Sequence, residues 1–380
     1  MKITFFSNFL SPYQKDFCNE MYKSLGDNFH FIATEPIPVE RINLGWDDKS
    51  NECLYTINTY ESDENMNRGL SLGYESDVVI IGSAPEDFVA KRIKDNRLTF
   101  RYSERIFNKG SWQLFSPRLM LKCFQRHIKH RNKNLHMLCA SAYLKEDLEK
   151  LFAYPEKLWK WGYFPEVRVF EESQLFQKKS KKVIKLLWAG RFLDWKRPQQ
   201  AVEIAKRLAE NGYDFSLNII GNGEQKNLIV SFIKKYKLEN NIKLLIAISD
   251  AEVRENMEEA DIYLFTSNRR EGWGVVLNEA MRSGCAVVAA QSIGSVPFLI
   301  KNGENGFIYP DNDINIMYDY VKLLIEDNNL REKIGRQAYY TMRDTWNPKV
   351  AASRIIMLSD SLLNNKDASL LYADGPCSKA

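Results

Sequence analysis

The sequence is poor in the residues that build metal sites and disulfide frameworks. It has four histidines among 380 residues, and its six cysteines form neither a Cys-x-x-Cys pair nor a metal-ligand spacing with histidine. These absences argue against a zinc site and against a disulfide-stapled fold. We therefore expect no bound metal and no cofactor, and a reducing, cytoplasmic setting.

Long hydrophobic runs are also lacking. No stretch approaches the ~18 consecutive apolar residues of a transmembrane helix. Residues 2–6 read as a strand, not as a charged segment followed by an apolar one, so we expect no signal peptide. The composition, with 44% hydrophobic and 27% charged residues, is typical of a globular protein. A chain of this length suits two domains.

Strand patterns alternate with helical patterns, which predicts parallel sheets. Ser11 and Pro12 predict the N-cap and first turn of a helix that ends near residue 25, and Pro198 starts a helix that ends near residue 211. We place the linker between two doubly wound halves at residues 161–165. The expected strands are 2–6, 29–33, 77–82, 98–102 and 135–140, then 185–188, 215–220, 242–247, 262–265, 286–289 and 306–309.

Two carboxylates flank a glycine-rich turn between a buried strand and a helix. Glu271 falls in the turn, and Glu279 falls in the second turn of the helix. The first residues of that helix, 272–275, offer free backbone N–H groups and the positive end of the helix dipole. A phosphate group would suit this position.

Two cations follow an earlier strand. Arg191 and Lys196 come after the apolar run 185–188, and the carboxyl ends of parallel strands are where open α/β sheets bind ligands. Fixed positive charges at such an edge can hold a diphosphate and neutralise it as it leaves. The alternative is that both are solvated surface residues.

Five segments of the second half resemble the retaining GT-B glycosyltransferases of family 4. The resemblance covers most of residues 183–350 and implies an α/β GT-B fold, in which two Rossmann-like domains face each other across a cleft. It implies an acceptor domain at 1–165, a nucleotide-sugar donor domain at 166–346, and a C-terminal helix within 347–380 that crosses back to the first domain. The matching segments are 190–196, 219–224, 271–279, 284–289 and 302–307.

The resemblance also implies roles for individual residues. Arg191 and Lys196 would bind the donor diphosphate, Glu279 the ribose hydroxyls, and Glu271 the hydroxyls of the donor sugar. The turn amides would meet the phosphate and the sugar. The implied donor-binding set is Glu279, Gly272, Trp273, Gly274, Val275, Gly190, Asn222 and Ile248.

Three features depart from the family pattern. In the base-binding region, residues 246–248 stand where the family carries a glycine after the strand. The loop at 7–11 contains no glycine, and the strand at 98–102 is not followed by the histidine that many relatives place against the donor sugar. Glu104 is the alternative candidate for orienting the sugar or accepting the acceptor's proton. None of the four histidines stands at the family position, and we expect His127 and His130 to be surface residues.

Two short motifs have simpler interpretations. Asp311 and Asp313 spell the D-x-D of metal-dependent transferases, but they follow a strand and precede a helical pattern at 314–326, so Asp313 is better explained as an N-cap. Gly221, Asn222 and Gly223 resemble part of a dinucleotide fingerprint that lacks its third glycine and its distant acid.

Basic residues gather at 97–133, where ten Lys/Arg accompany a single acid, Glu104, and several aromatic residues. Such a segment suits an anionic membrane, a nucleic acid or an acidic acceptor, or it is a solvated helix face beside ordinary core aromatics. Because relatives often use lipid-linked acceptors, we favour the membrane and expect no nucleic acid.

We therefore expect a retaining, metal-independent glycosyltransferase, peripheral on the inner face of the cytoplasmic membrane. It would move a hexose or N-acetylhexosamine from a UDP-sugar to a lipid-linked or oligosaccharide acceptor in surface polysaccharide assembly. The alternatives are a nucleotide-sugar epimerase or hydrolase, and a catalytically silent scaffold that binds sugar nucleotides.

Overall fold

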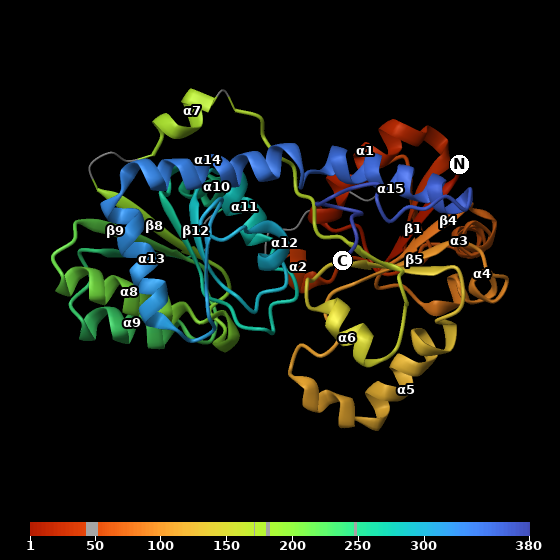
Figure 1. Cartoon of the computed structure of the whole chain (residues 1–380), viewed down its shortest axis with the longest axis horizontal. Coiled ribbons are helices and arrows are strands. Elements are labelled where there is room, and N and C mark those ends of the chain that lie inside the picture. Colours follow the sequence, from red (N-terminus) through yellow and green to blue (C-terminus); the bar gives the residue numbers. More distant parts are fainter. Residues whose placement is uncertain (43–51, 171, 180–182, 247–248) are drawn as a thin grey trace. The chain divides into compact units, whose positions relative to one another are not determined.

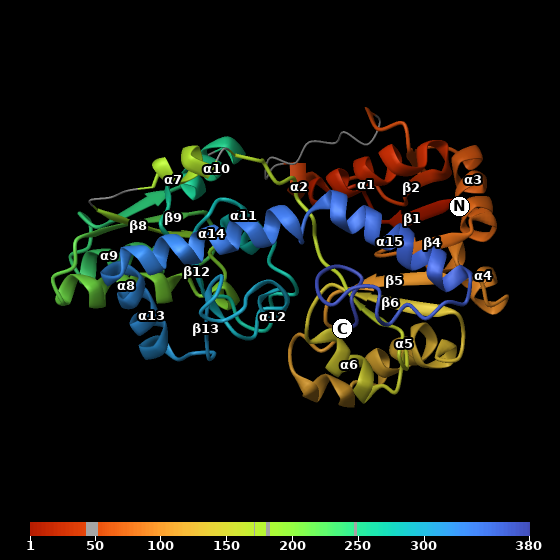
Figure 2. The same ribbon diagram turned by 45° about the horizontal axis from the view of Figure 1, so that its top comes forward.

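The computed structural model describes residues 1–42, 52–170, 172–179, 183–246 and 249–380. This part of the chain divides into two compact units, each built on its own sheet. The first unit contains residues 1–166 and 346–380, and the second contains residues 167–345. In each unit, helices lie on both sides of the sheet (Figures 1 and 2).

The first unit contains a seven-stranded sheet in the order β3-β2-β1-β4-β5-β6-β7. Every neighbouring pair is parallel. The order reverses between β1 and β4, as in doubly wound folds. The strands are β1 (Ile3–Ser7), β2 (Phe29–Ala33), β3 (Thr56–Asn58), β4 (Val78–Ile81), β5 (Thr99–Ser103), β6 (Leu135–Cys139) and β7 (Leu158–Lys160).

Neighbouring side chains of β1 face opposite sides of this sheet, as the two-residue period of a strand requires. Phe5 packs edge-to-face on Phe17 of α1 (Pro12–Leu25), with ring centroids 6.2 Å apart. Phe6 packs on Phe88, with centroids 5.1 Å apart. A single buried strand therefore supplies both layers of the core, which is typical of a parallel sheet covered on both faces.

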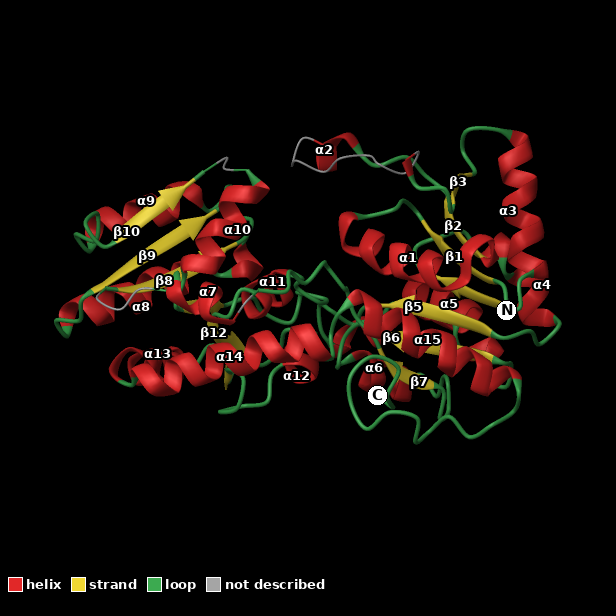
Figure 3. Ribbon diagram, turned by 90° about the horizontal axis from the view of Figure 1, so that it is seen from above, coloured by secondary structure: helices red, strands yellow, loops and turns green. Residues whose placement is uncertain are grey.

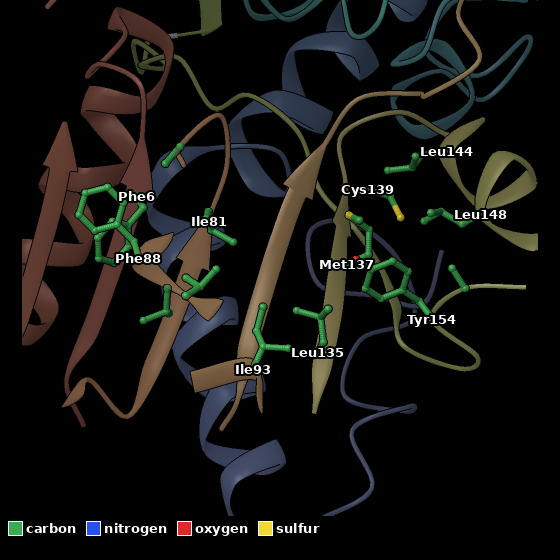
Figure 4. Close-up of a cluster of buried hydrophobic side chains, with 14 of the residues drawn as sticks. Phe6, Ile81, Phe88, Ile93, Leu135, Met137, Cys139, Leu144, Leu148 and Tyr154 are labelled. Atoms are coloured by element: carbon green, nitrogen blue, oxygen red, sulfur yellow. The ribbon is translucent and has the colours of Figure 1, made fainter. Parts of the chain in front are cut away.

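The layer that contains Phe6 and Phe88 is the cluster drawn in Figure 4. In it, Ile81 and Met137 of the sheet pack with Leu144 of the helical layer. Apolar side chains on the inner sides of four helices close this layer, so each helix is held by its buried face. The helices are α3 (Asp63–Glu75), α4 (Ala90–Lys94), α5 (Pro117–Arg126) and α6 (Leu144–Lys150).

The C-terminal residues complete the first unit. Helix α15 (Pro348–Leu363) lies beside α1 (Figure 2). Beyond it, residues 377–380 run antiparallel to β7. The Cys377 amide donates to the Lys160 carbonyl at 2.8 Å, and the Lys160 amide donates to the Ser378 carbonyl at 2.8 Å. The outer edge of β7 is therefore hydrogen-bonded.

The second unit contains a six-stranded parallel sheet in the order β10-β9-β8-β11-β12-β13. This order repeats that of the first six strands of the other sheet, with the reversal between β8 and β11. The strands are β8 (Ile184–Ala189), β9 (Phe215–Ile220), β10 (Ile242–Leu245), β11 (Ile262–Phe265), β12 (Ala286–Ala290) and β13 (Phe307–Tyr309).

Helices cover both faces of the second sheet as well (Figures 1 and 3). Helix α8 contacts α9 and α13 on one face, and α11 contacts α10 and α14 on the other. The bounds are α8 (Pro198–Glu210), α9 (Lys226–Lys235), α10 (Asp250–Glu259), α11 (Val276–Arg282), α13 (Ile314–Glu326) and α14 (Asn328–Asp344), with the short α7 (Glu172–Gln177) and α12 (Val296–Leu299).

The predicted strands are confirmed, each to within two residues, and the two sheets confirm the two Rossmann-like halves. Strands β3 and β7, which have three residues each, were not predicted. Ser11 is the N-cap residue of α1, as predicted, but its hydroxyl donates to Gln14 Oε1 at 3.2 Å and does not cap a backbone N–H.

Candidate functional site

The candidate site lies in the second unit, where the strand order reverses. Strands β8 and β11 are adjacent and parallel, with Ile262 opposite Leu186. The chain leaves their carboxyl ends through two loops, 190–197 and 266–275. Loops that leave neighbouring strands at a reversal point diverge toward opposite faces of the sheet, and the crevice between them is the usual ligand position in such folds.

Hydrogen bonds hold the two loops together. The Thr266 hydroxyl donates to the Lys196 carbonyl at 2.7 Å, and the Trp188 indole N–H donates to the Thr266 hydroxyl oxygen at 2.8 Å. The Asn268 amide donates to the Trp195 carbonyl at 2.8 Å. Thr266, Asn268 and Trp195 were not predicted as site residues, because none of them belongs to a recognisable motif.

Lys196 and Glu271 meet across these loops. Their Nζ and Oε2 atoms are 2.5 Å apart, and the two side chains are only 16% and 13% exposed. They stand 75 positions apart in the sequence, so the fold alone brings them together. A partly buried ion pair is screened less by solvent than a surface pair, and it fixes the orientation of both charges.

Arg191 supplies a second cation beyond β8. Its side chain is exposed, and none of the ion pairs found within the described ranges involves it. Arg191 and Lys196 thus differ: one charge is held by a carboxylate, and the other is open to an incoming anion.

The turn after Glu271 depends on a glycine. Gly274 has φ +81°, and a Cβ at this position would lie 2.5 Å from Cζ of Phe265. Trp273 is buried, and its indole N–H donates to Asn278 Oδ1 at 2.9 Å. The Trp273 side chain therefore anchors the turn inside the unit. Contact of a ligand with the backbone amides of Gly272, Trp273, Gly274 and Val275 stays a prediction.

Glu279 lies on α11, a helix of only seven residues. Burial raises the pKa of its carboxyl, and Arg282 and Arg254 oppose this shift. The Arg282 Nη2 atom lies 3.8 Å from Glu279 Oε1. Glu279 thus stands one helical turn beyond the glycine turn, with a cation beside its carboxylate.

The predicted donor-binding residues outside this turn occupy neighbouring loops. The Gly190 amide donates to the Ile220 carbonyl at 3.0 Å. Asn222 is exposed, and its Oδ1 accepts the Gly223 amide at 2.9 Å. Gly190 and Asn222 therefore lie side by side after β8 and β9, whereas Ile248 lies outside the described residues.

A further loop approaches Glu271. The Gly294 amide donates to the Glu271 carbonyl at 3.3 Å, which brings the segment after β12 to the site. The Arg270 guanidinium lies over the Trp195 ring, 4.4 Å from its centroid. The sequence pattern gave no signal for Gly294 or for this cation–π contact.

Glu104 belongs to the first unit, where it follows β5. The Tyr163 hydroxyl donates to Glu104 Oε1 at 3.0 Å. Burial and the nearby Glu104 carboxylate raise the pKa of Tyr163 far above its ordinary value. Glu104 is thus held within a tyrosine cluster at the carboxyl edge of its own sheet, and its predicted role remains a prediction.

His127 is half-buried, so the prediction of a surface residue holds only in part. Its Nδ1 lies 2.9 Å from the hydroxyl of Tyr154, which is buried. Burial, reinforced by Arg101 and Arg126, lowers the pKa of His127 to about 3. The basic sequence around this histidine concealed its inward contact.

The D-x-D sequence is a turn, as predicted. Asp313 is the N-cap of α13, and its Oδ1 accepts the amides of Asn315 and Ile316 at 3.2 and 3.1 Å. Asp311 accepts the Ser292 hydroxyl at 2.5 Å. Across the described ranges, no group of three or more His, Cys, Asp and Glu side chains is placed to hold a metal ion.

In the described part of the chain, no helix combines the length and the apolar composition that crossing a bilayer requires.

Comparisons with known proteins give matches in sequence and in structure. Residues 170–341 match the family model of the glycosyl transferases group 1. This range contains Arg191, Lys196, Glu271 and Glu279. The match therefore covers nearly all of the second unit, residues 167–345, and the whole of the candidate site.

Sequence relatives cover part of the chain. The amylovoran biosynthesis glycosyltransferase AmsK of Erwinia amylovora is 30% identical over 135 residues, which are 34% of this chain and 33% of that protein. The capsular polysaccharide biosynthesis glycosyltransferase CapM of Staphylococcus aureus is 26% identical over 208 residues, 52% of this chain and 53% of that protein. The chain thus spans a third to about half of the length of these relatives.

A solved structure matches nearly the whole chain. The crystal structure of Anabaena Alr3699/HepE in complex with UDP has a TM-score of 0.70 and 14% identity, and the match covers 95% of this chain and all of that one. Similarity at this identity shows the fold. The chain has the two-domain GT-B fold, and its residues 170–341 are similar to the glycosyl transferases group 1.

Proposed function

We propose that this protein is a glycosyltransferase that takes a hexose or an N-acetylhexosamine from a nucleoside diphosphate sugar, with uridine as the base. The observation that carries the proposal is the Lys196–Glu271 pair at the strand reversal, inside the segment that matches the glycosyl transferases group 1. The structural neighbour HepE was solved in complex with UDP, which favours uridine.

The proposed roles follow from charge and position. Arg191 and Lys196 bind the diphosphate, and the amides of the 272–275 turn add donors for its oxygens. Glu279 accepts hydrogen bonds from the ribose hydroxyls, and Glu271 accepts them from the donor sugar. Because Lys196 already pairs with Glu271, it can contact the diphosphate while it still orients the carboxylate that faces the sugar.

The reaction we propose retains the configuration of the sugar, as in family 4. The bond between the anomeric carbon and the phosphate oxygen breaks, and a bond to the acceptor oxygen forms on the same face. The acceptor hydroxyl passes its proton to the leaving phosphate. Arg191 and Lys196 stabilise the negative charge that develops on that phosphate, which is the contribution a metal ion makes in other transferases. We therefore propose metal-independent transfer.

The acceptor we propose is a lipid-linked saccharide or an oligosaccharide of a surface polysaccharide. The relatives AmsK and CapM are named for the biosynthesis of amylovoran and of capsular polysaccharide, which supports an acceptor of this class. With such an acceptor, the protein would act at the cytoplasmic face of the membrane, and the basic segment 97–133 would contribute to binding there.

Two other functions make different predictions. An epimerase or hydrolase would consume the donor in the absence of any acceptor. A silent scaffold would bind the sugar nucleotide without consuming it. Transfer that requires an acceptor distinguishes our proposal from both.

The experiment that tests the donor site is a thermal-shift titration with UDP, GDP, ADP and TDP and their sugars, with and without EDTA. A ligand that binds only the native state stabilises it by about 2.7 kcal/mol at a concentration of 100 times its Kd. We expect a shift for the uridine ligands that survives EDTA and is lost in Arg191→Ala/Lys196→Ala. A shift that EDTA abolishes would contradict metal independence, and no shift with any nucleotide would contradict the site.

A further inference from the structure

The basic segment 97–133 divides into an internal part and a surface part. Arg101 is buried, and its guanidinium donates to both carboxylate oxygens of Glu86 at 2.7 and 2.6 Å. Arg105 is also buried and lies 3.7 Å from Asp147. These cations stabilise the interior of the first unit. The cations available to a partner are therefore other members of the segment.

Helix α5 exposes two different strips of side chains. Cys123 is buried in the core cluster, with Leu119 and Met120 packed against it. On the outer side, Leu121 and Phe124 stand one turn apart and are 59% and 50% exposed. Residues three or four positions apart share a helix face, so these two form an apolar strip on the outer side.

A basic strip runs beside the apolar one. Arg118 and Lys122 are both exposed, and their spacing of four places them on the same line of the helix. Helix α5 therefore presents apolar and cationic side chains next to one another on its outer side. This arrangement is typical of helices that lie in the interface of a bilayer.

The turn before α5 adds two exposed aromatic rings. In the 3-10 helix η4 (Ser111–Phe115), Trp112 is 63% exposed and Phe115 is 87% exposed. The Trp112 indole N–H donates to the Lys109 carbonyl at 2.9 Å. The indole N–H of Trp112 therefore already has a hydrogen-bond acceptor within the protein. Moving the ring into an apolar medium would leave no unpaired donor.

Along the chain, the charge around α5 is of one sign, although in space Arg126 of this helix pairs with Glu86 at 2.8 Å. No acidic residue occurs from residue 105 to residue 145. Within the described ranges, no ion pair involves Arg118, Lys122, Lys129 or Arg131. A surface with four unneutralised cations attracts a polyanion.

We propose that the exposed side chains of residues 111–126, the 111–126 surface, dock on an anionic lipid bilayer. The apolar members enter the boundary between headgroups and acyl chains, and the basic members contact lipid phosphates. A bilayer fits better than a nucleic acid because bulky apolar side chains line one strip and the cations another. The inference rests on the proposed function for its lipid-linked acceptor, but bilayer binding itself requires no sugar transfer.

The test is flotation of the full chain with vesicles of phosphatidylcholine, alone or mixed with phosphatidylglycerol. We expect binding only to the mixed vesicles. Each basic residue near an anionic surface contributes about 1 kcal/mol, so Arg118→Ala/Lys122→Ala should weaken binding about thirty-fold. Trp112→Ala/Phe115→Ala should also weaken binding, and the loss should persist at high salt because it is not electrostatic.

Matched controls lie in the same unit. Lys349 and Lys366 are exposed cations, and Leu370 is 89% exposed. We expect Lys349→Ala/Lys366→Ala and Leu370→Ala to bind the mixed vesicles as strongly as the unsubstituted protein does. Equal losses in the control and test variants would overturn the proposal, as would a parent that binds no anionic vesicle at low salt or that binds single-stranded RNA in preference to vesicles. UDP-induced thermal shifts in the same samples report separately on the donor site.

Discussion

The two units share a strand order and differ in how their loops at the point of reversal use polar groups. In the first unit, the Asn8 carbonyl accepts the amides of Thr34 and Glu35 at 2.9 and 2.7 Å, and the Ser7 hydroxyl donates to Asn8 Oδ1 at 3.2 Å. In the second unit, the corresponding loops carry Lys196 paired with Glu271. The first unit thus uses these polar groups for local structure, whereas the second holds charges beside a glycine turn.

This contrast indicates that a shared scaffold does not imply a shared role. The sheet order fixes where a ligand would enter, and the loops decide what it meets there. Binding of a diphosphate requires cations and close backbone approach. Glycines and cations stand together after β8 and β11, while the loop after β1 contains no glycine.

The variant Glu271→Ala tests most directly whether the second unit holds the active site. We expect kcat for sugar transfer to fall by about 10²–10³, because removing one preorganised polar contact to a reacting group has this effect in other enzymes. The UDP-induced thermal shift should remain, since Arg191 and Lys196 are still present. Transfer from the UDP-sugar and the thermal shift are measured on the same preparation.

The control for this variant is Glu259→Ala. Glu259 pairs with Lys185 at 2.9 Å in the same unit, with both side chains well exposed. A surface pair contributes little, so transfer should be unchanged. If Glu271→Ala retained full transfer, the active site that we assign to the second unit would be wrong.

The second prediction concerns the glycine turn. Gly274→Ala should lower the free energy of unfolding of the second unit by more than Gly212→Ala does. Both glycines have positive φ, +81° and +74°, so both variants incur the left-handed cost of about 1–2 kcal/mol. A Cβ at Gly274 also meets Phe265 at 2.5 Å, whereas nothing lies within 4 Å of one at Gly212.

Pulse proteolysis in urea, with fragments assigned to each unit by mass, measures this difference. Equal destabilisation by the two alanines would show that Phe265 relaxes away from the new methyl group. In that event, steric contact would not explain why the turn requires glycine.

The smallest expected effect is a difference between the two units in how their stability changes with pH. Burial lowers the pKa of both His127 and His136 to about 3, whereas an unfolded histidine titrates near 6.5. Between these values the unfolded state binds more protons, so the first unit loses stability as the pH falls. The loss is at most about 1.4 kcal/mol per pH unit for each histidine.

The second unit should respond in the opposite direction. Residues 167–345 contain no histidine, and burial raises the pKa of Glu279 and of Asp261 above their ordinary values. Their native forms bind protons more readily, so acid favours the native second unit. Pulse proteolysis at about pH 7 and about pH 5 should show the divergence, and His127→Gln/His136→Gln should reduce the slope of the first unit. Parallel slopes in the parent protein would contradict this account.

Much of the fold could be predicted from the sequence because parallel strands are buried on both faces. The apolar run of β4, all four residues of which are buried, is visible without a structure. Strand β13 has only three residues but is apolar throughout. Strands β3 and β7 are equally short and include polar residues, Thr56 and Asn58 in β3 and Lys160 in β7, so neither stands out as an apolar run. Ser11 is the N-cap residue, as predicted, but the bond of its hydroxyl to Gln14 could not be foreseen, because a serine at an N-cap can bond a side chain instead of a backbone amide.

The candidate site could be predicted only in part. The position of each residue after a strand indicated that Lys196 and Glu271 belong to the same edge of a sheet, but no spacing rule predicts an ion pair across 75 positions. The contacts of Thr266 and Gly294 depend on loop geometry that leaves no pattern in the sequence. The contact between His127 and Tyr154 could not be predicted, because the polar residues next to His127 in the sequence carry no information about it.

The pairing of residues 377–380 with β7 bears on how copies of this protein behave toward one another. An open strand edge recruits a strand from another molecule, and exchange of such a segment between copies produces swapped dimers. Here that edge is occupied from within the chain, and the Lys145 ammonium further holds the segment through the Ala380 carbonyl at 2.8 Å. Any modification that detaches these four residues would convert a closed edge into a site of self-association.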